Sequence, residues 1–387
     1  MYILGQTSTE TILFFIFYGI TGVVPLLAAL YLLLRPGNAI APDVTPPLRL
    51  RRWTAAFFAV AALAHVWWLL FVLYSGDLHS AAYSVLVIVD YVLLFTTFAG
   101  MLLAMLQDRR RPVWPALVGL IPFVALWGAC MVYPHQLLEQ VTAAYLVLLG
   151  LLFTAYMAFA IRQYGRWLND NYADLENKKV WLCQAVALGS MLLFVLYALA
   201  TDMILIWLIH IVELVLVGLL LWRVETLPQL KEIVVKPTDS PSESEDAHNT
   251  SLTTHRSPVL STIDLEQIEQ LLNERCVATQ LYLKHDITRD QLAKLLGTNR
   301  SYLSQYFSRL GITYNTYINN LRINHFIMVY EASVAAGEPV SAQKLAFESG
   351  FSSYRTFSRA FLQRTNESAT AWMDDTAAKY CGVNLQK

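Results

Sequence analysis

Two arginines four residues apart, Arg355 and Arg359, lie in a stretch near the C-terminus that contains no acidic residue. Side chains four apart share one face of a helix, and the forked arginine guanidinium pairs with guanine or grips phosphate. From Lys284 to Arg364 there are ten basic and five acidic residues, although the whole chain has a net charge of −1. This stretch has the local charge and the side chains needed to bind DNA.

A second group of ionisable residues lies inside long apolar runs: His65, Asp90, His210 and Glu213. A carboxylate in mid-bilayer costs roughly 3 kcal/mol, so each needs a partner, a proton or a wet cavity. One interpretation is a shared polar pocket that senses a ligand or protons. The alternatives are packing contacts between helices, or a metal site, since histidine and carboxylates suit zinc.

Motifs that would indicate an enzyme are absent from the sequence. There is no G-x-S-x-G, no H-E-x-x-H and no glycine-rich phosphate loop. We therefore expect a protein that is not an enzyme, with no catalytic residues, no cofactor and no metal.

The composition predicts that the first part of the chain is embedded in a membrane. Hydrophobic residues make up 56% of the chain and charged residues only 15%, against about 25% in an ordinary soluble domain. A bilayer core is crossed by roughly 20 apolar residues in a helix. Seven runs of that kind contain no Lys or Arg: residues 11–34, 53–74, 81–106, 114–133, 141–161, 180–200 and 203–222.

The distribution of Lys and Arg predicts the orientation of these spans. Segments 35–52 and 162–179 carry four Lys or Arg residues each, and segment 107–113 carries three. The N-terminal ten residues and segments 75–80, 134–140 and 201–202 carry none. Because positive loops stay in the cytoplasm, the N-terminus is expected outside and the C-terminal region inside. The outer loops are short, which favours an unknown small or lipid-like signal. Residues 237–258 are rich in Ser, Thr, Pro and acids and are expected to be a disordered linker.

An internal repeat organises the C-terminal region, after an amphipathic helical pattern over residues 262–283. Leu292-Ala293 with Gly297 recurs 53 residues later as Leu345-Ala346 with Gly350, and Leu303/Phe307 recurs 54 later as Phe357/Phe361. Thr288, Asn299, Ser341 and Ser352 or Ser353 are expected to cap helices, and the glycines to form the corners. The pattern predicts two helix–turn–helix units, at about 288–310 and 341–364, joined by a helix from about Tyr314 to Ala332.

This arrangement resembles the DNA-binding domain of the AraC/XylS family of bacterial transcription regulators. The resemblance runs from about residue 270 to 373 and is most specific at L-A-x-x-x-G-F-x-x-x-x-x-F-S-R-x-F, Leu345 to Phe361. Family members usually continue with Gly-x-Thr-Pro, where this chain has Asn366-Glu367-Ser368-Ala369. The repeat places Ser301, Gln305, Arg355 and Arg359 on the outer faces of the second helices, and the family's base-contacting positions carry over onto these residues. The full set of candidate DNA-binding residues is Arg300, Ser301, Tyr302, Ser304, Gln305, Tyr354, Arg355, Thr356 and Arg359.

The sequence thus predicts an all-α protein: a seven-helix transmembrane bundle over residues 1–236, a linker, and a cytoplasmic double helix–turn–helix domain over 259–387. We expect a one-component, sequence-specific transcription regulator in the bacterial inner membrane. Its expected partners are double-stranded DNA and the lipid bilayer, and the sequence is compatible with a homodimer. The competing hypothesis is an intramembrane sensor or metal-dependent enzyme whose C-terminal domain docks a protein partner.

Overall fold

The computed structural model describes residues 8–35, 37–74, 81–133, 135–175, 178–199, 203–230 and 262–384. These residues form helices and no strands, so the expected all-α class is confirmed. The chain divides into two compact units. Unit 1 comprises Met1–Tyr164 and Asn177–Glu232, and unit 2 comprises Gly165–Glu176 and Ile233–Lys387. The expected linker, residues 237–258, lies outside the described residues.

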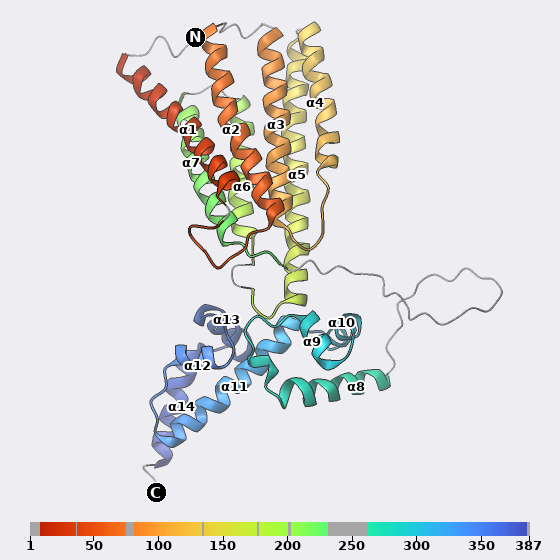
Figure 1. Cartoon of the computed structure of the whole chain (residues 1–387), viewed down its shortest axis with the longest axis vertical. Coiled ribbons are helices and arrows are strands. Elements are labelled where there is room, and N and C mark those ends of the chain that lie inside the picture. The colour runs from red at the N-terminus through yellow and green to blue at the C-terminus, as the bar shows by residue number, and fades with distance from the viewer. Residues whose placement is uncertain are drawn as a thin grey trace, which may run out of the picture. The chain divides into compact units, whose positions relative to one another are not determined.

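Unit 1 is a bundle of helices, shown from red to green in Figure 1. A helix lies over each of the seven apolar runs: α1 (Ser8–Leu34), α2 (Leu48–Tyr74), α3 (Ala81–Met105), α4 (Trp114–Val132), α5 (Gln136–Asn171), α6 (Trp181–Leu199) and α7 (Met203–Thr226). Four of them, α1, α2, α5 and α7, exceed the runs, because the residues there also favour a helix. α2 begins five residues before Trp53, and α5 continues ten residues past Ile161.

Six of these helices are long and apolar enough to cross a membrane within the described residues. In α6 the described apolar stretch, Trp181–Leu193, is shorter than a full span. Only 11–44% of the most apolar window of each candidate helix is buried inside the protein. Most of this apolar surface therefore faces outward, as expected for helices solvated by lipid. The number of crossings stays a prediction.

Close helix packing in unit 1 depends on a small residue. α2 packs against α1 and α3. At the second of these contacts the ring of Trp53 lies over Gly100 of α3, where an added Cβ would come within 2.3 Å of the indole. The side chain that the sequence places at the end of a predicted span is thus seated on a neighbouring helix.

One end of unit 1 is joined by polar contacts among the basic segments. Arg111, only 2% exposed, pairs with Asp108 and accepts a hydrogen bond from Arg49 through its backbone oxygen. Gln107 donates to the backbone oxygen of Pro228, 3.1 Å away, and accepts from the backbone N–H of Leu230 at 2.8 Å. The arginine-rich segments are therefore ordered parts of this end of the bundle.

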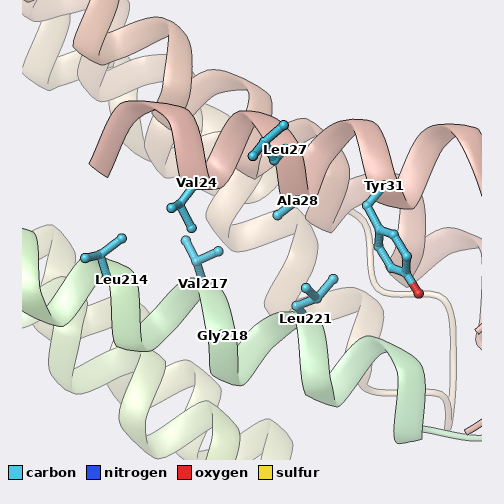
Figure 2. Close-up of a pocket in the computed structure, with 8 residues that line it drawn as sticks. All are labelled: Val24, Leu27, Ala28, Tyr31, Leu214, Val217, Gly218 and Leu221. Atoms are coloured by element: carbon cyan, nitrogen blue, oxygen red, sulfur yellow. The ribbon is translucent and has the colours of Figure 1, made fainter. Parts of the chain in front are cut away.

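An apolar groove of about 380 Å³ runs between α1 and α7 (Figure 2). It is lined by Val24, Leu27, Ala28, Tyr31, Leu214, Val217, Gly218 and Leu221. Apart from the phenol of Tyr31, which donates to Glu225, these side chains are aliphatic or absent. The groove offers no group for chemistry.

Unit 2 contains two helix–turn–helix units joined by a long helix. Its helices are α8 (Thr262–Leu272), α9 (Arg289–Leu296), α10 (Arg300–Arg309), α11 (Tyr314–Ala336), α12 (Ala342–Glu348), α13 (Tyr354–Thr365) and α14 (Ala369–Asn384). The joining helix α11 is four residues longer than expected. Where the sequence departs from the family pattern, Asn366 adopts a left-handed φ of 58° and ends α13.

The helical pattern over residues 262–283 is not one helix. α8 ends at Leu272 and is followed by a π-helical turn, Asn273–Val277, and a 3₁₀ turn, Leu281–Leu283. Gln280, with a left-handed φ of 54°, separates the two turns. A single left-handed residue redirects the chain without interrupting the apolar pattern. The pattern therefore continues across a break in the helix.

Gly350 yields a stability prediction. Its φ is +88°, and an added Cβ would lie 2.6 Å from the backbone oxygen of Leu283. We expect Gly350→Ala to destabilise unit 2 by more than about 2 kcal/mol, since left-handed strain alone costs roughly 1–2 kcal/mol. Gly337→Ala is the matched control, because Gly337 has a φ of +74° with open space around it. Pulse proteolysis of the full-length protein in urea measures both, and equal losses would refute the close approach.

Candidate DNA-binding site

The first helix–turn–helix unit begins and turns at the residues that the sequence indicates. Thr288 forms a capping box with Gln291, in which each side chain bonds the other residue's backbone N–H. Gly297 ends α9 with a left-handed φ of 73°, and the Asn299 side chain then caps α10 by accepting from the N–H of Tyr302 at 2.9 Å. These three expectations are confirmed.

The second unit repeats the design with different residues. Ser341 caps α12 by accepting from the N–H of Lys344, and Gly350 supplies the left-handed corner. Ser353, rather than Ser352, caps α13 through the N–H of Thr356 at 3.2 Å. The cap of α13 places its first turn with Arg355 exposed.

The two cores decide which face of each second helix points outward. Leu303 and Phe307 of α10 are buried in the core of the first unit, and Phe357 and Phe361 of α13 are fully buried in that of the second. The inward stripe is therefore the one expected from the repeat. Among the candidate DNA-binding residues, Ser301, Arg355 and Arg359 are exposed, whereas Arg300, Tyr302, Ser304, Gln305, Tyr354 and Thr356 are half-buried.

Several of the half-buried candidates have structural contacts. The ring of Tyr354 packs on Phe357 with centroids 5.6 Å apart, and the Thr356 hydroxyl lies 3.1 Å from that of the cap Ser353. Such residues orient the helix as well as face the groove. Arg355 and Arg359 are the candidates whose exposed guanidinium groups are best placed for bases or phosphate.

The first unit contains a buried arginine that sequence reasoning missed. Arg289, only 7% exposed, donates to Ser304 Oγ at 3.2 Å and to Asn171 Oδ1 at 3.1 Å. Arg300 donates to the same Asn171 oxygen at 2.8 Å. Burial lowers the pKa of Arg289 to about 10, and the neighbouring charge of Arg300 adds to that shift.

The two helix–turn–helix units are joined by a second arginine that sequence reasoning missed, Arg322 of α11. Its guanidinium, 1% exposed, donates to the backbone oxygens of Tyr282 and Lys284, both 2.8 Å away. The same group lies over the ring of Phe351, 5.6 Å from its centroid, at the corner of the second unit. Burial lowers the pKa of Arg322 to about 10, so it remains charged at neutral pH.

Three of the four ionisable residues in the apolar runs meet in unit 1. His65 Nε2 lies 3.6 Å from Glu213 Oε2, and the rings of His65 and His210 are 5.7 Å apart. The ring of Tyr18, which sequence reasoning missed, lies 4.8 Å from that of His65 and 5.5 Å from that of His210. Helices α1, α2 and α7 thus contribute to one polar cluster.

Asp90, the fourth residue, accepts a hydrogen bond from the indole of Trp68 at 3.2 Å. Its other carboxylate oxygen has no partner among the described residues. Within that part of the chain, no group of three or more His, Cys, Asp and Glu is arranged to hold a metal ion.

Residues 292–375 match a protein-family model described as a helix-turn-helix domain, of the AraC type. This region is similar to AraC-type helix–turn–helix domains. The match extends from α9 into α14, so the resemblance inferred from the repeat is confirmed for this part of the chain. The comparisons with curated proteins and with solved structures found no match. The domain points to a DNA-binding regulator rather than an enzyme.

Arg322 yields a prediction about the stability of the contact between the two helix–turn–helix units. We expect Arg322→Met to destabilise unit 2 by about 3 kcal/mol, because it leaves buried backbone oxygens without donors. Arg322→Lys should recover only part of this, since one ammonium does not reproduce the fork. Urea-dependent pulse proteolysis of the full-length chain measures both variants. A loss below about 1 kcal/mol for Arg322→Met would show that the guanidinium is dispensable.

Proposed function

We propose that this protein is a membrane-bound one-component transcription regulator that binds specific DNA sequences through unit 2 and senses its signal through unit 1. The observation that carries the proposal is the AraC-type helix–turn–helix domain on the same chain as six helices apolar enough to cross a membrane. A single chain then holds both the input and the output. No second component is needed between them.

DNA recognition is assigned to the outward faces of α10 and α13. In a helix–turn–helix unit the second helix enters the major groove, and two units on one chain reach grooves about 34 Å apart. Arg355 and Arg359 supply charge and bidentate reading in the second unit. Ser301 and Gln305 supply neutral contacts in the first unit, so it contributes register more than affinity.

Unit 1 is proposed to cross the bacterial inner membrane seven times, with the basic segments and unit 2 in the cytoplasm. Two observations support this placement in the membrane. The helices expose most of their apolar surface, and Arg49 and Arg111 lie together at one ordered end of the bundle. Basic side chains at one end are what the positive-inside rule requires.

The cluster of Tyr18, His65, His210 and Glu213 is proposed as the sensing site. It joins three helices through polar groups that lie in otherwise apolar segments, where each unpaired charge is costly. A signal that alters the His65–Glu213 pair changes the relative free energies of two helix arrangements. Such a signal shifts a population between them in proportion to its differential affinity.

Replacing the two exposed arginines tests DNA binding. We expect Arg355→Ala/Arg359→Ala to remove discrete peaks when the tagged full-length protein is crosslinked in cells and its bound DNA is sequenced. Loss of two bidentate contacts costs roughly 2–6 kcal/mol. With purified protein, the slope of log K for DNA binding against log salt concentration should also decrease in magnitude by about two.

The charge-matched control is Lys344→Ala/Lys379→Ala, which removes two exposed cations that pair with surface acids on α12 and α14. It should retain the peaks. Peaks that persist in the arginine variant would overturn the assignment of Arg355 and Arg359. Recovery no better than an untagged control, under several growth conditions, would favour a protein-docking role for unit 2.

The proposed sensing cluster yields its own prediction. Glu213→Gln keeps the shape of the side chain and replaces the carboxyl group that faces His65 Nε2 at 3.6 Å with an amide. We expect the output of a reporter driven by a recovered target promoter to change at least about threefold, because the balance between two states is altered. Glu139→Gln, at an exposed position in the first turn of α5, is the control. Equal output from both variants, at equal protein levels, would remove the cluster from signalling.

A further inference from the structure

A short acidic segment outside residues 262–387 belongs to unit 2. Residues 169–174, Asn-Asp-Asn-Tyr-Ala-Asp, form the last turn of α5 and the loop after it, here called the acidic loop. The loop contains two carboxylates and no basic residue, although Arg162, Arg166, Lys178 and Lys179 flank it. It therefore carries a local negative charge within a segment whose basic residues predict a cytoplasmic location.

The acidic loop is packed against the first helix–turn–helix unit. Asn171, 2% exposed, accepts hydrogen bonds from both Arg289 and Arg300 through its side-chain oxygen. The backbones of Tyr172 and Thr288 form an antiparallel bridge at the start of α9. Ala173, 1% exposed, is part of the same hydrophobic core as Leu303 and Phe307.

The loop also reaches the joining helix and the second unit. Asn315, in the first turn of α11, donates to the backbone oxygens of Tyr172 and Ala173 at 3.2 and 2.5 Å. Ser352, next to the cap of α13, donates to the carboxylate of Asp174, which is 7% exposed. The contacts thus gather at the N-terminal ends of α9, α10, α11 and α13.

These helix ends are the part of the fold best suited to phosphate. Helix N-termini present unpaired N–H groups and a positive dipole end, and arginine adds a full charge. In a helix–turn–helix unit the first helix crosses the DNA backbone, and the N-terminal residues of the second reach the bases. Arg300 and Ser304, both candidate DNA contacts, are respectively bonded to Asn171 and to the Arg289 that Asn171 holds.

We propose that the acidic loop occupies the phosphate-binding side of the first helix–turn–helix unit, and that DNA and the acidic loop compete for it. This inference rests on the proposed function, which it deepens by naming a regulatory contact. The acidic loop supplies an amide oxygen to Arg289 and Arg300, and the carboxylate of Asp174 to Ser352, where DNA would supply phosphate oxygens. The acidic loop belongs to unit 2 and includes the last turn of α5, whose earlier residues form a predicted membrane span.

The chemistry of Asn171 allows the contact to be changed in both directions. Asn171→Ala removes the shared acceptor of Arg289 and Arg300, whereas Asn171→Asp replaces it with a carboxylate and strengthens the pairing. Asn169→Ala is the matched control, because the amide that bonds the two arginines is that of Asn171. A misfolded variant would lose DNA binding, so tighter binding cannot arise from damage.

The experiment uses full-length protein in lipid nanodiscs of one fixed composition. The probe is a 40-base-pair duplex library of random sequence, enriched separately with wild type and with each variant, followed by affinity measurement on the enriched duplex. We expect Asn171→Ala to bind about tenfold more tightly than wild type, because the loss of the acceptor shared by Arg289 and Arg300 weakens the competing contact. A tenfold change corresponds to about 1.4 kcal/mol. Asn171→Asp should bind more weakly, and Asn169→Ala should match wild type.

Hydrogen exchange supplies a second measurement on the same samples. Amides of residues 169–174 should exchange faster in wild type once the duplex is added, because DNA displaces the acidic loop. Equal affinity of wild type and Asn171→Ala, or exchange of the acidic loop that DNA leaves unchanged, would overturn the competition while leaving DNA binding intact. Failure of every variant to enrich any duplex would overturn the proposed function and this inference together.

Discussion

The buried guanidinium of Arg322 is the interaction on which the DNA-binding domain depends. A charge that is 1% exposed is tolerated only when its donors are satisfied, and here the backbone oxygens of Tyr282 and Lys284 and the face of Phe351 surround it. Those partners come from the segment before α9 and from the corner of the second unit. One side chain of the joining helix therefore sets the spacing of two otherwise separate cores, and that spacing is what a two-groove reader must keep constant.

Local rules were enough to predict the elements of unit 2. Capping by Thr288, Asn299 and Ser341, and the left-handed corner at Gly350, depend on a few neighbouring residues, so they are visible in one sequence. The break after Leu272 was not predicted, since the apolar periodicity of residues 262–283 continues across it. The extra length of α5 was not predicted either, because polar residues end a predicted membrane span without ending the helix.

Long-range contacts between polar side chains were beyond sequence reasoning. Asn171 and Arg289 are 118 residues apart, and nothing in the local pattern of either position indicates the other. Three of the four members of the polar cluster of unit 1 were named from the sequence. The cost of a charge in an apolar run singled out His65, His210 and Glu213, but Tyr18 gives no such signal because its side chain is an uncharged phenol. Composition identifies groups that need partners, and only the fold assigns them.

The two helix–turn–helix units differ in how exposed their arginines are, and this difference suits regulation by the acidic loop. Arg355 and Arg359 are exposed, while Arg289 and Arg300 of the first unit are bonded to Asn171. Under the proposed competition, Arg355 and Arg359 remain exposed for phosphate while the acidic loop covers the N-terminal ends of α9 and α10. One unit alone gives weak, salt-sensitive attachment, whereas both units together fix register across two grooves. Under the proposed competition, release of the acidic loop converts attachment by one helix–turn–helix unit into sequence-specific binding by both.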